Sequence, residues 1–84
     1  MKLTARSEYA LLAMIHMARN YSEAYLPTER IARAENIPLR FLEQILLLLK
    51  RSRYVQSARG QKGGVRLARD PSQITLAEIV RLLD

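Results

Sequence analysis

Residues 28–51, TERIARAENIPLRFLEQILLLLKR, are the stretch that decides the fold. The first eight residues predict a short helix with Ile31 on its inward side. Asn36 can adopt the left-handed conformation that ends a helix, and Pro38 suits the first position of the next helix, where its missing N–H is not needed. A short helix, a tight turn around a buried Ile37 and a longer helix together predict a helix-turn-helix.

The longer helix, predicted over residues 39–51, has one apolar and one polar side. Its apolar positions recur at the i, i+3, i+4, i+7 spacing of a buried helix face, at Leu42, Ile45, Leu46 and Leu49. Polar side chains then fall on the opposite side. Leu47 and Leu48 make the apolar stripe wider than a small core needs, so we expect one of them to be exposed.

A further helix is predicted ahead of this stretch, over residues 4–20. Thr4 is a suitable N-cap residue. Tyr9, Leu12 and Ile15, with Met14 and Ala18 nearby, recur at helical spacing and predict the stripe that faces the core.

A β-hairpin and a last helix are predicted after it. Residues 54–58 and 65–68 have the composition of two short strands, joined by a glycine-rich connection. Thr75 and Glu78 form a capping box that begins a helix over residues 76–83. The order α-α-α-β-β-α predicts a mainly α winged helix-turn-helix, filling residues 1–84 as one domain. Its recognition helix covers about 39–51, and the hairpin, residues 54–68, is its wing.

The positive charge of the chain is concentrated in one segment. Between positions 50 and 69 there are seven basic residues and no acidic one, which is half of the 14 Lys and Arg residues behind the net charge of +6. We call this set the basic block: Lys50, Arg51, Arg53, Arg59, Lys62, Arg66 and Arg69. Such a cluster predicts a salt-sensitive attraction to the phosphates of a nucleic acid.

Several classes of protein are disfavoured by composition. There is no cysteine, so neither disulfides nor a thiolate metal site is expected within these residues, and His16, the single histidine, has no partner for a metal site. No nucleophile or phosphate-binding loop indicates an enzyme. The first residues lack a signal-peptide pattern and no apolar run approaches the roughly 20 residues of a membrane span, so we expect a soluble, cytoplasmic protein without a membrane partner.

The residues also resemble a known family over the whole chain. The chain is similar to the Rrf-two family of bacterial winged-helix transcription regulators, which includes an iron–sulfur cluster regulator, a nitric-oxide-sensitive repressor and a cysteine-metabolism repressor. The most specific matches are Leu42-Glu43-Gln44 and the wing sequence Arg59-Gly60 followed by Gly63-Gly64. The other matches are Leu3-Thr4, Tyr9-Ala10, Ile31-Ala32, Ile37-Pro38, Leu67-Ala68-Arg69, Ile74-Thr75 and Glu78-Ile79.

The resemblance implies a homodimer that binds double-stranded DNA at a palindromic operator. It implies that residues near the start of the recognition helix read bases in the major groove: Leu39, Arg40, Phe41, Glu43 and Gln44. It implies that Arg59 of the wing enters the minor groove. Family members often carry an iron–sulfur cluster on cysteines that follow this point, but those cysteines are absent from this sequence, so no cofactor is expected within these residues. Phe41 stands where the family often has Tyr, and Arg53 and Val65 stand where it often has Gly and Tyr.

The chemistry of these side chains agrees with base recognition. Glutamine can bond adenine with two hydrogen bonds, glutamate can accept one from cytosine, and Arg40 can bind guanine or a phosphate. An arginine such as Arg59 gains from the enhanced negative potential of a narrow, A/T-rich minor groove. Candidate phosphate contacts, which position a protein without reading sequence, are Lys2, Thr4, Arg6, Tyr9, Lys50, Arg51 and Lys62.

The interpretation is a sequence-specific DNA-binding domain of a transcription regulator, most simply a repressor. Its main alternative is a winged helix that binds another protein, for which the wide leucine surface at Leu47 and Leu48 would serve as the interface. Double-stranded RNA is a weaker alternative, because its narrow major groove does not admit a reading helix.

Overall fold

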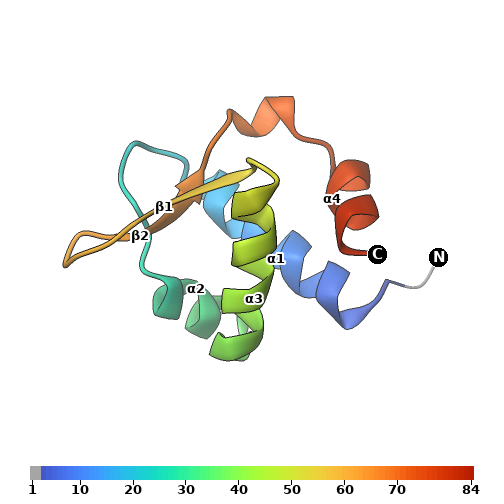
Figure 1. The fold of residues 1–84 in the computed structure, drawn as a ribbon, viewed down its shortest axis with the longest axis horizontal. Helices are drawn as coiled ribbons and strands as arrows, with labels where there is room; N and C mark the ends of the chain where they lie inside the picture. Colours follow the sequence, from blue (N-terminus) through green and yellow to red (C-terminus); the bar gives the residue numbers. More distant parts are fainter. Residues whose placement is uncertain (1–2) are drawn as a thin grey trace.

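The computed structural model describes residues 3–84, so the predicted phosphate contact Lys2 lies outside the described residues. The chain folds in the predicted order, with a short 3₁₀ helix, η1, added before the last helix (Figure 1). The elements are α1 (Ala5–Arg19), α2 (Thr28–Glu35), α3 (Leu39–Arg51), β1 (Val55–Ala58), β2 (Gly64–Leu67), η1 (Pro71–Gln73) and α4 (Leu76–Leu83). The hairpin extends from one side of the helical body, and α4 lies on the opposite side.

The helix-turn-helix is formed by α2 and α3 as the sequence predicts. Asn36 ends α2 with a left-handed backbone, φ 55°. The N–H of Ile37 donates to the carbonyl of Ala32 at 2.8 Å, and the Ile37 side chain is buried. One detail of the prediction is wrong: Pro38 is the residue that flanks α3, and Leu39 is the first helical position. Proline serves there because its extended backbone (φ −56°, ψ 129°) directs the chain into the helix.

The buried face of α1 includes Met14 of the predicted stripe but not Leu12 or Ile15. Leu12 and Ile15 are each 38% exposed, and Tyr9 is only half-buried. The buried side chains of α1 are those of Ser7, Ala10, Ala13, Met14 and Met17. Because α1 is apolar around most of its circumference, the spacing of its large residues does not identify the inward side. Small alanine side chains on that side let neighbouring helices approach closely.

The hairpin pairs β1 and β2 in antiparallel register, with Val55 opposite Leu67 and Ser57 opposite Val65. Each strand is close to its predicted length. Gly64 belongs to β2, whereas Tyr54 and Ala68 lie just beyond the strands and remain joined by a backbone hydrogen bond of 2.9 Å.

The segment after the hairpin is fixed by two local caps. Asp70 accepts a hydrogen bond from the backbone N–H of Ser72 at 2.9 Å and from its hydroxyl at 2.8 Å; these bonds lower the pKa of the Asp70 carboxyl below its usual range. Thr75 caps α4 as predicted, its Oγ1 accepting the N–H of Glu78 at 3.2 Å. The return bond of a full capping box, from the Glu78 side chain, is not formed within residues 3–84.

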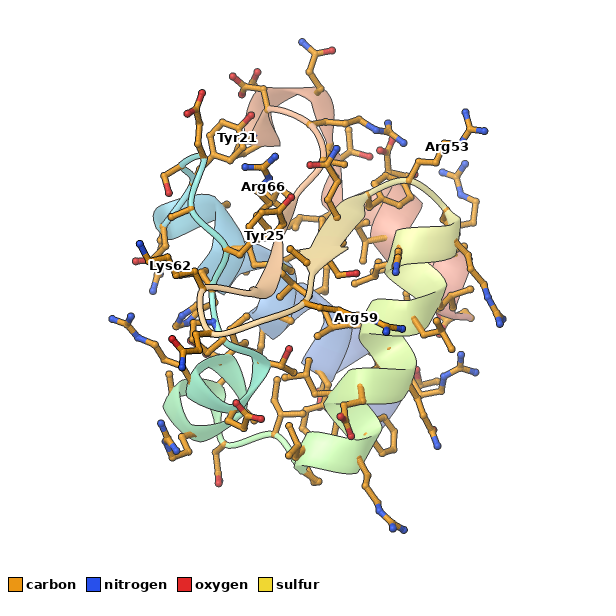
Figure 2. All side chains as sticks on the ribbon, turned by 60° about the vertical axis from the view of Figure 1, so that its left-hand side comes forward. Tyr21, Tyr25, Arg53, Arg59, Lys62 and Arg66 are labelled. Atoms are coloured by element: carbon orange, nitrogen blue, oxygen red, sulfur yellow. The ribbon has the colours of Figure 1, made fainter. Side chains whose placement is uncertain are left out.

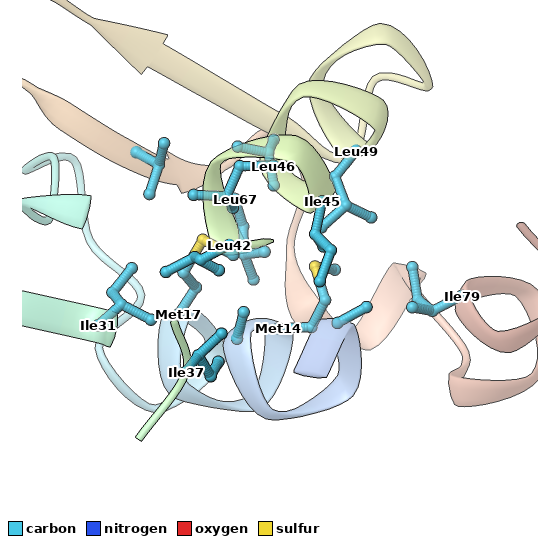
Figure 3. Close-up of a cluster of buried hydrophobic side chains, with 14 of the residues drawn as sticks. Met14, Met17, Ile31, Ile37, Leu42, Ile45, Leu46, Leu49, Leu67 and Ile79 are labelled. Carbon is cyan, nitrogen blue, oxygen red and sulfur yellow. The ribbon is translucent and has the colours of Figure 1, made fainter. Parts of the chain in front are cut away.

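The core is a single cluster between α1 and the inner face of α3 (Figure 3). All four predicted α3 positions (Leu42, Ile45, Leu46 and Leu49) are buried in it. Met14 and Met17 face α3 from below, and side chains of α2, β2 and α4 close the edges. The apolar face of α3 is therefore used by the core, which leaves its opposite face to solvent.

Candidate nucleic-acid interface

The outer face of α3 carries most of the predicted base-reading residues. Leu39, Arg40, Glu43 and Gln44 are all exposed. Positions 40, 44, 47 and 51 recur at i, i+4, i+7 and i+11, and they form the stripe opposite the buried leucines. An exposed helical face of this kind has the shape that the major groove of B-form DNA admits.

Phe41 lies at the side of this face, not at its centre. Its ring is half-buried and meets the ring of Tyr9 edge-on, with centroids 5.2 Å apart and planes at 75°. The pair joins the first turn of α3 to α1. This packing brings the predicted base contact Phe41 and the predicted phosphate contact Tyr9 together, and it leaves less of both rings for a ligand.

Leu47 is the exposed member of the leucine pair. Its side chain is 49% exposed, whereas Leu48 is half-buried against the core. Leu47 also forms one wall of a pocket of about 190 Å³ between α3 and the hairpin. The pocket has an apolar floor and polar side chains at its edge; it is lined by Thr28, Glu43, Leu46, Leu47, Lys50, Val55, Ser57 and Val65. The α3 face and the wing are therefore separated by a hollow.

The tip of the wing is a tight glycine turn that carries two exposed cations. Arg59 follows β1 directly, and Lys62 lies in the turn. The turn is closed by a hydrogen bond of 3.0 Å from the N–H of Gly63 to the carbonyl of Gly60, whose φ is +102°. Figure 2 shows the Arg59 side chain extending from the hairpin toward α3 and Lys62 on the other side of the turn.

The remaining predicted phosphate contacts fall into two groups. Lys50 and Arg51 are exposed in the last turn of α3, and Arg6 is exposed in the first turn of α1. Thr4 is exposed as well, but its hydroxyl oxygen already accepts the N–H of Ser7 and lies 3.1 Å from a carboxylate oxygen of Asp84. A phosphate at Thr4 would have to approach that carboxylate.

The basic block divides into exposed and engaged residues. The guanidinium of Arg66 lies over the ring of Tyr25, 4.3 Å from its centroid, and that of Arg69 lies over Tyr54 at 4.4 Å. Both arginines also donate hydrogen bonds to neighbouring segments. The sequence analysis included both arginines in the basic block that attracts phosphates. No sequence pattern links them to Tyr25 and Tyr54, so their contacts with these rings could not be predicted.

Few of the charges are neutralised by an ion pair. In the part of the chain that the structure describes, the one contact at ion-pair distance between side chains that can carry opposite charges joins Nδ1 of His16 to Oε2 of Glu35 at 2.8 Å, a hydrogen bond that links α1 to α2. Arg59, Lys62, Lys50 and Arg51 have no carboxylate within ion-pair distance among residues 3–84. Their charge is therefore available to an external anion.

The comparisons with known proteins agree with this arrangement. Residues 3–84 match the model of the Rrf2 family, described as an iron-dependent transcriptional regulator. The chain belongs to the Rrf2 family. The HTH-type transcriptional regulator IscR of Photorhabdus laumondii is 36% identical over 84 residues, which is 100% of this chain and 51% of that protein. This Rrf2-family chain thus spans about half the length of the curated relatives it matches.

Solved structures of Rrf2-family regulators share the fold. The structure of T. potens IscR superposes with a TM-score of 0.93 at 31% identity, covering 100% of this chain and 61% of that one. CymR, the global cysteine regulator of B. subtilis, gives a TM-score of 0.94 at 32% identity, with 100% and 65% coverage. These matches confirm the winged-helix architecture and the predicted family, and the relatives are named as regulators, not enzymes.

The iron in the family description raises the question of a metal site. Iron–sulfur clusters are held by cysteine thiolates, and the 84 residues contain no cysteine. Nor do three His, Asp or Glu side chains gather as metal ligands anywhere within residues 3–84. These residues therefore do not fit such a cluster. None of the helices described is long and apolar enough to cross a bilayer.

Proposed function

We propose that this chain is the sequence-specific DNA-binding domain of a transcription regulator, acting as a repressor. In this proposal the outer face of α3 enters the major groove, with Arg40, Glu43 and Gln44 at base edges. Arg59 enters the adjacent minor groove. The observation that carries the proposal is the exposed, mostly polar face of α3 next to basic residues that have no ion-pair partner within residues 3–84, since base edges and phosphates would be contacted from one side.

Contacts to bases and contacts to phosphates contribute differently to the free energy of DNA binding. Each well-placed pair of hydrogen bonds to a base is worth about 1–3 kcal/mol of discrimination. Each cation on a phosphate adds affinity for every sequence and releases counterions, so that it contributes about 0.9 to the salt slope. Glu43 and Gln44 would therefore set specificity, whereas Lys50, Arg51 and Lys62 would set affinity.

The oligomeric form of the complex is also part of the proposal. A homodimer on a palindromic operator would place two α3 helices in successive major grooves, about 34–36 Å apart. The cytoplasm is the expected location for such a regulator.

A protein-interaction module is the second candidate, and the exposed Leu47 favours it. An apolar side chain in the middle of the α3 face could pack against a protein partner as readily as against the methyl group of a thymine. Sequence-selective binding to duplex DNA separates the two candidates.

The test is fluorescence anisotropy with the duplex upstream of the chain's own coding region and a scrambled duplex of equal length. Titrations run from about 50 to 200 mM salt, the range over which phosphate contacts weaken steeply. We expect tighter binding to the native duplex, and the preference should persist as salt rises. Equal and steeply salt-dependent binding to both duplexes would contradict sequence reading, and no binding to either would favour the protein-interaction module.

A further inference from the structure

The loop that joins α1 to α2, residues 20–27, pairs with the outer edge of the wing. The N–H of Leu26 donates to the carbonyl of Val65 at 2.7 Å, and the N–H of Val65 donates to the carbonyl of Leu26 at 2.8 Å. These two bonds form an isolated antiparallel bridge on the edge of β2 that does not face β1. Since a two-stranded hairpin is barely stable alone, this third extended segment matters for its rigidity.

Gly64 allows the bridge to form. Its φ is +140°, and a Cβ atom at this position would overlap the carbonyl group of Leu26. Only glycine accommodates both the backbone conformation and the close approach.

Arg66 joins the same three segments through its side chain. Its guanidinium lies over the ring of Tyr25 and donates to the carbonyl oxygen of Glu23, both in the α1–α2 loop. Its Nε donates to Oε1 of Gln56 on β1 at 3.1 Å. Figure 2 shows Arg66 and Tyr25 near each other on the side of the hairpin away from α3, and Arg59 on the side that faces α3.

We propose that Arg66 and Tyr25 are positioning residues for the wing: they hold the hairpin at the angle that presents Arg59, and Arg66 itself is not a phosphate contact. This inference rests on the proposed function. The bridge to the α1–α2 loop lies at Val65, opposite Ser57, in the half of the hairpin next to the turn, so it fixes the backbone close to the point from which Arg59 extends. A wing that is already fixed loses less conformational entropy when it binds, so Arg59 contributes more to affinity.

The chemistry of Arg66 supports a positioning role over a phosphate contact. Its side chain is half-buried, and its donors already face two protein oxygens. Two of its five N–H donors and one face of the guanidinium are therefore already engaged within the protein. Arg59, by comparison, has an exposed side chain with no hydrogen-bond partner within the described residues.

The test compares Tyr25→Leu, which removes the ring under Arg66, with Tyr25→Phe, which keeps it. The Tyr25 hydroxyl makes no hydrogen bond within residues 3–84, so Tyr25→Phe should bind the native duplex within about twofold of the unaltered chain. Tyr25→Leu should weaken binding by about three- to tenfold.

A double-mutant cycle shows whether the loss acts through Arg59. Arg59→Ala should cost a markedly smaller factor in the Tyr25→Leu background than in the unaltered chain. Gln44→Ala, which tests α3, should cost the same factor in both backgrounds. If Arg59→Ala also costs the same factor in both, Tyr25 does not act through the wing and the proposal is wrong.

A phosphate contact by Arg66 would give a different pattern. Arg66→Gln would then lower the salt slope by about 0.9 while Tyr25→Leu left affinity unchanged, and this result would overturn the proposal.

Hydrogen exchange in the DNA-free protein tests the support separately from any DNA reading. Tyr25→Leu should speed exchange at the Leu26 and Val65 amides by about tenfold and leave α3 amides such as that of Ile45 unchanged. Unchanged exchange at Leu26 and Val65 would show that Tyr25 does not hold the loop against the wing, whether or not the protein binds DNA. Accelerated exchange with no selective DNA binding would instead place the failure in the proposed function.

Discussion

Arg59 and Arg66 carry the same charge on the same hairpin, but they have different surroundings. Arg66, in β2, is held by Tyr25, Gln56 and the carbonyl of Glu23. Arg59, at the start of the turn, is exposed and has no ion-pair partner among residues 3–84. A basic cluster in a sequence is therefore not one functional unit. Charges that are packed on a tyrosine ring, at Arg66 and Arg69, stabilise the fold, whereas the exposed charges at the tip of the hairpin are available to a ligand.

The largest expected effect comes from removing the exposed charge. Replacing Arg59 and Lys62 together by Gln should lower the slope of log Kd against log salt by about 2 and weaken binding to the native and the scrambled duplex. The matched control replaces Arg19 and Arg81, two exposed arginines on α1 and α4, by Gln. Anisotropy titrations at several salt concentrations measure both. Equal slopes for the two double variants would mean that the wing charges contribute no more to DNA binding than exposed charges elsewhere on the surface.

The next effect tests the bridge between β2 and the α1–α2 loop. Gly64→Ala should lower the free energy of unfolding by about 2–3 kcal/mol, because it adds strain and breaks the bridge to Leu26. Gly60→Ala is the control: Gly60 also has a positive φ, but a Cβ there meets nothing within 4 Å, so about 1 kcal/mol is expected. Urea titrations give both values. A loss at Gly60 as large as that at Gly64 would mean that the contact with Leu26 does not stabilise the hairpin.

A smaller effect is expected at Arg69, the second engaged arginine. Arg69→Met keeps an apolar stem but removes the charge over Tyr54 and the hydrogen bond of 3.3 Å to the carbonyl of Arg53. The free energy of unfolding should fall by about 1 kcal/mol, while the salt slope of DNA binding stays constant. A lower salt slope with unchanged stability would instead assign Arg69 to the phosphate-binding set.

The smallest effect concerns the backbone just before the hairpin. Arg53 has φ +67°, a left-handed conformation that costs energy in any residue with a Cβ. Arg53→Gly should therefore raise the free energy of unfolding by about 0.5 kcal/mol, the relief of strain being partly offset by the greater freedom of glycine in the unfolded chain. Thermal denaturation would reveal it, and a fall in stability would show that the Arg53 side chain contributes more than its backbone costs.

The sequence predicts α3 well and α1 poorly, for a physical reason. In α3 the outer side is mostly polar, with Leu47 as an exposed exception, so the leucine and isoleucine spacing identifies one buried face, and the ends of the helix match the predicted residues. In α1 apolar residues surround most of the helix. The sequence favoured Leu12 and Ile15 because they are large, but the core accepts Ala10 and Ala13, which allow close helix packing.

The candidate interface was predictable in the same uneven way. The exposure of Arg40, Glu43, Gln44 and Arg59 follows from the helix pattern and the glycine turn. The second role of Arg66 depends on Tyr25, 41 positions earlier in the chain. No local pattern connects the two, since it is the tertiary fold, including the antiparallel bridge at Leu26, that brings the loop to the hairpin.

The most direct test of the account compares Gln44→Ala with Lys62→Ala on the native and the scrambled duplex at one salt concentration. Gln44→Ala should reduce the preference for the native duplex by about 1–3 kcal/mol, with little change on the scrambled one. Lys62→Ala should weaken binding to both by about the same factor and flatten the salt slope. If Gln44→Ala weakened both duplexes alike, α3 would hold DNA without reading it, and the central claim would be contradicted.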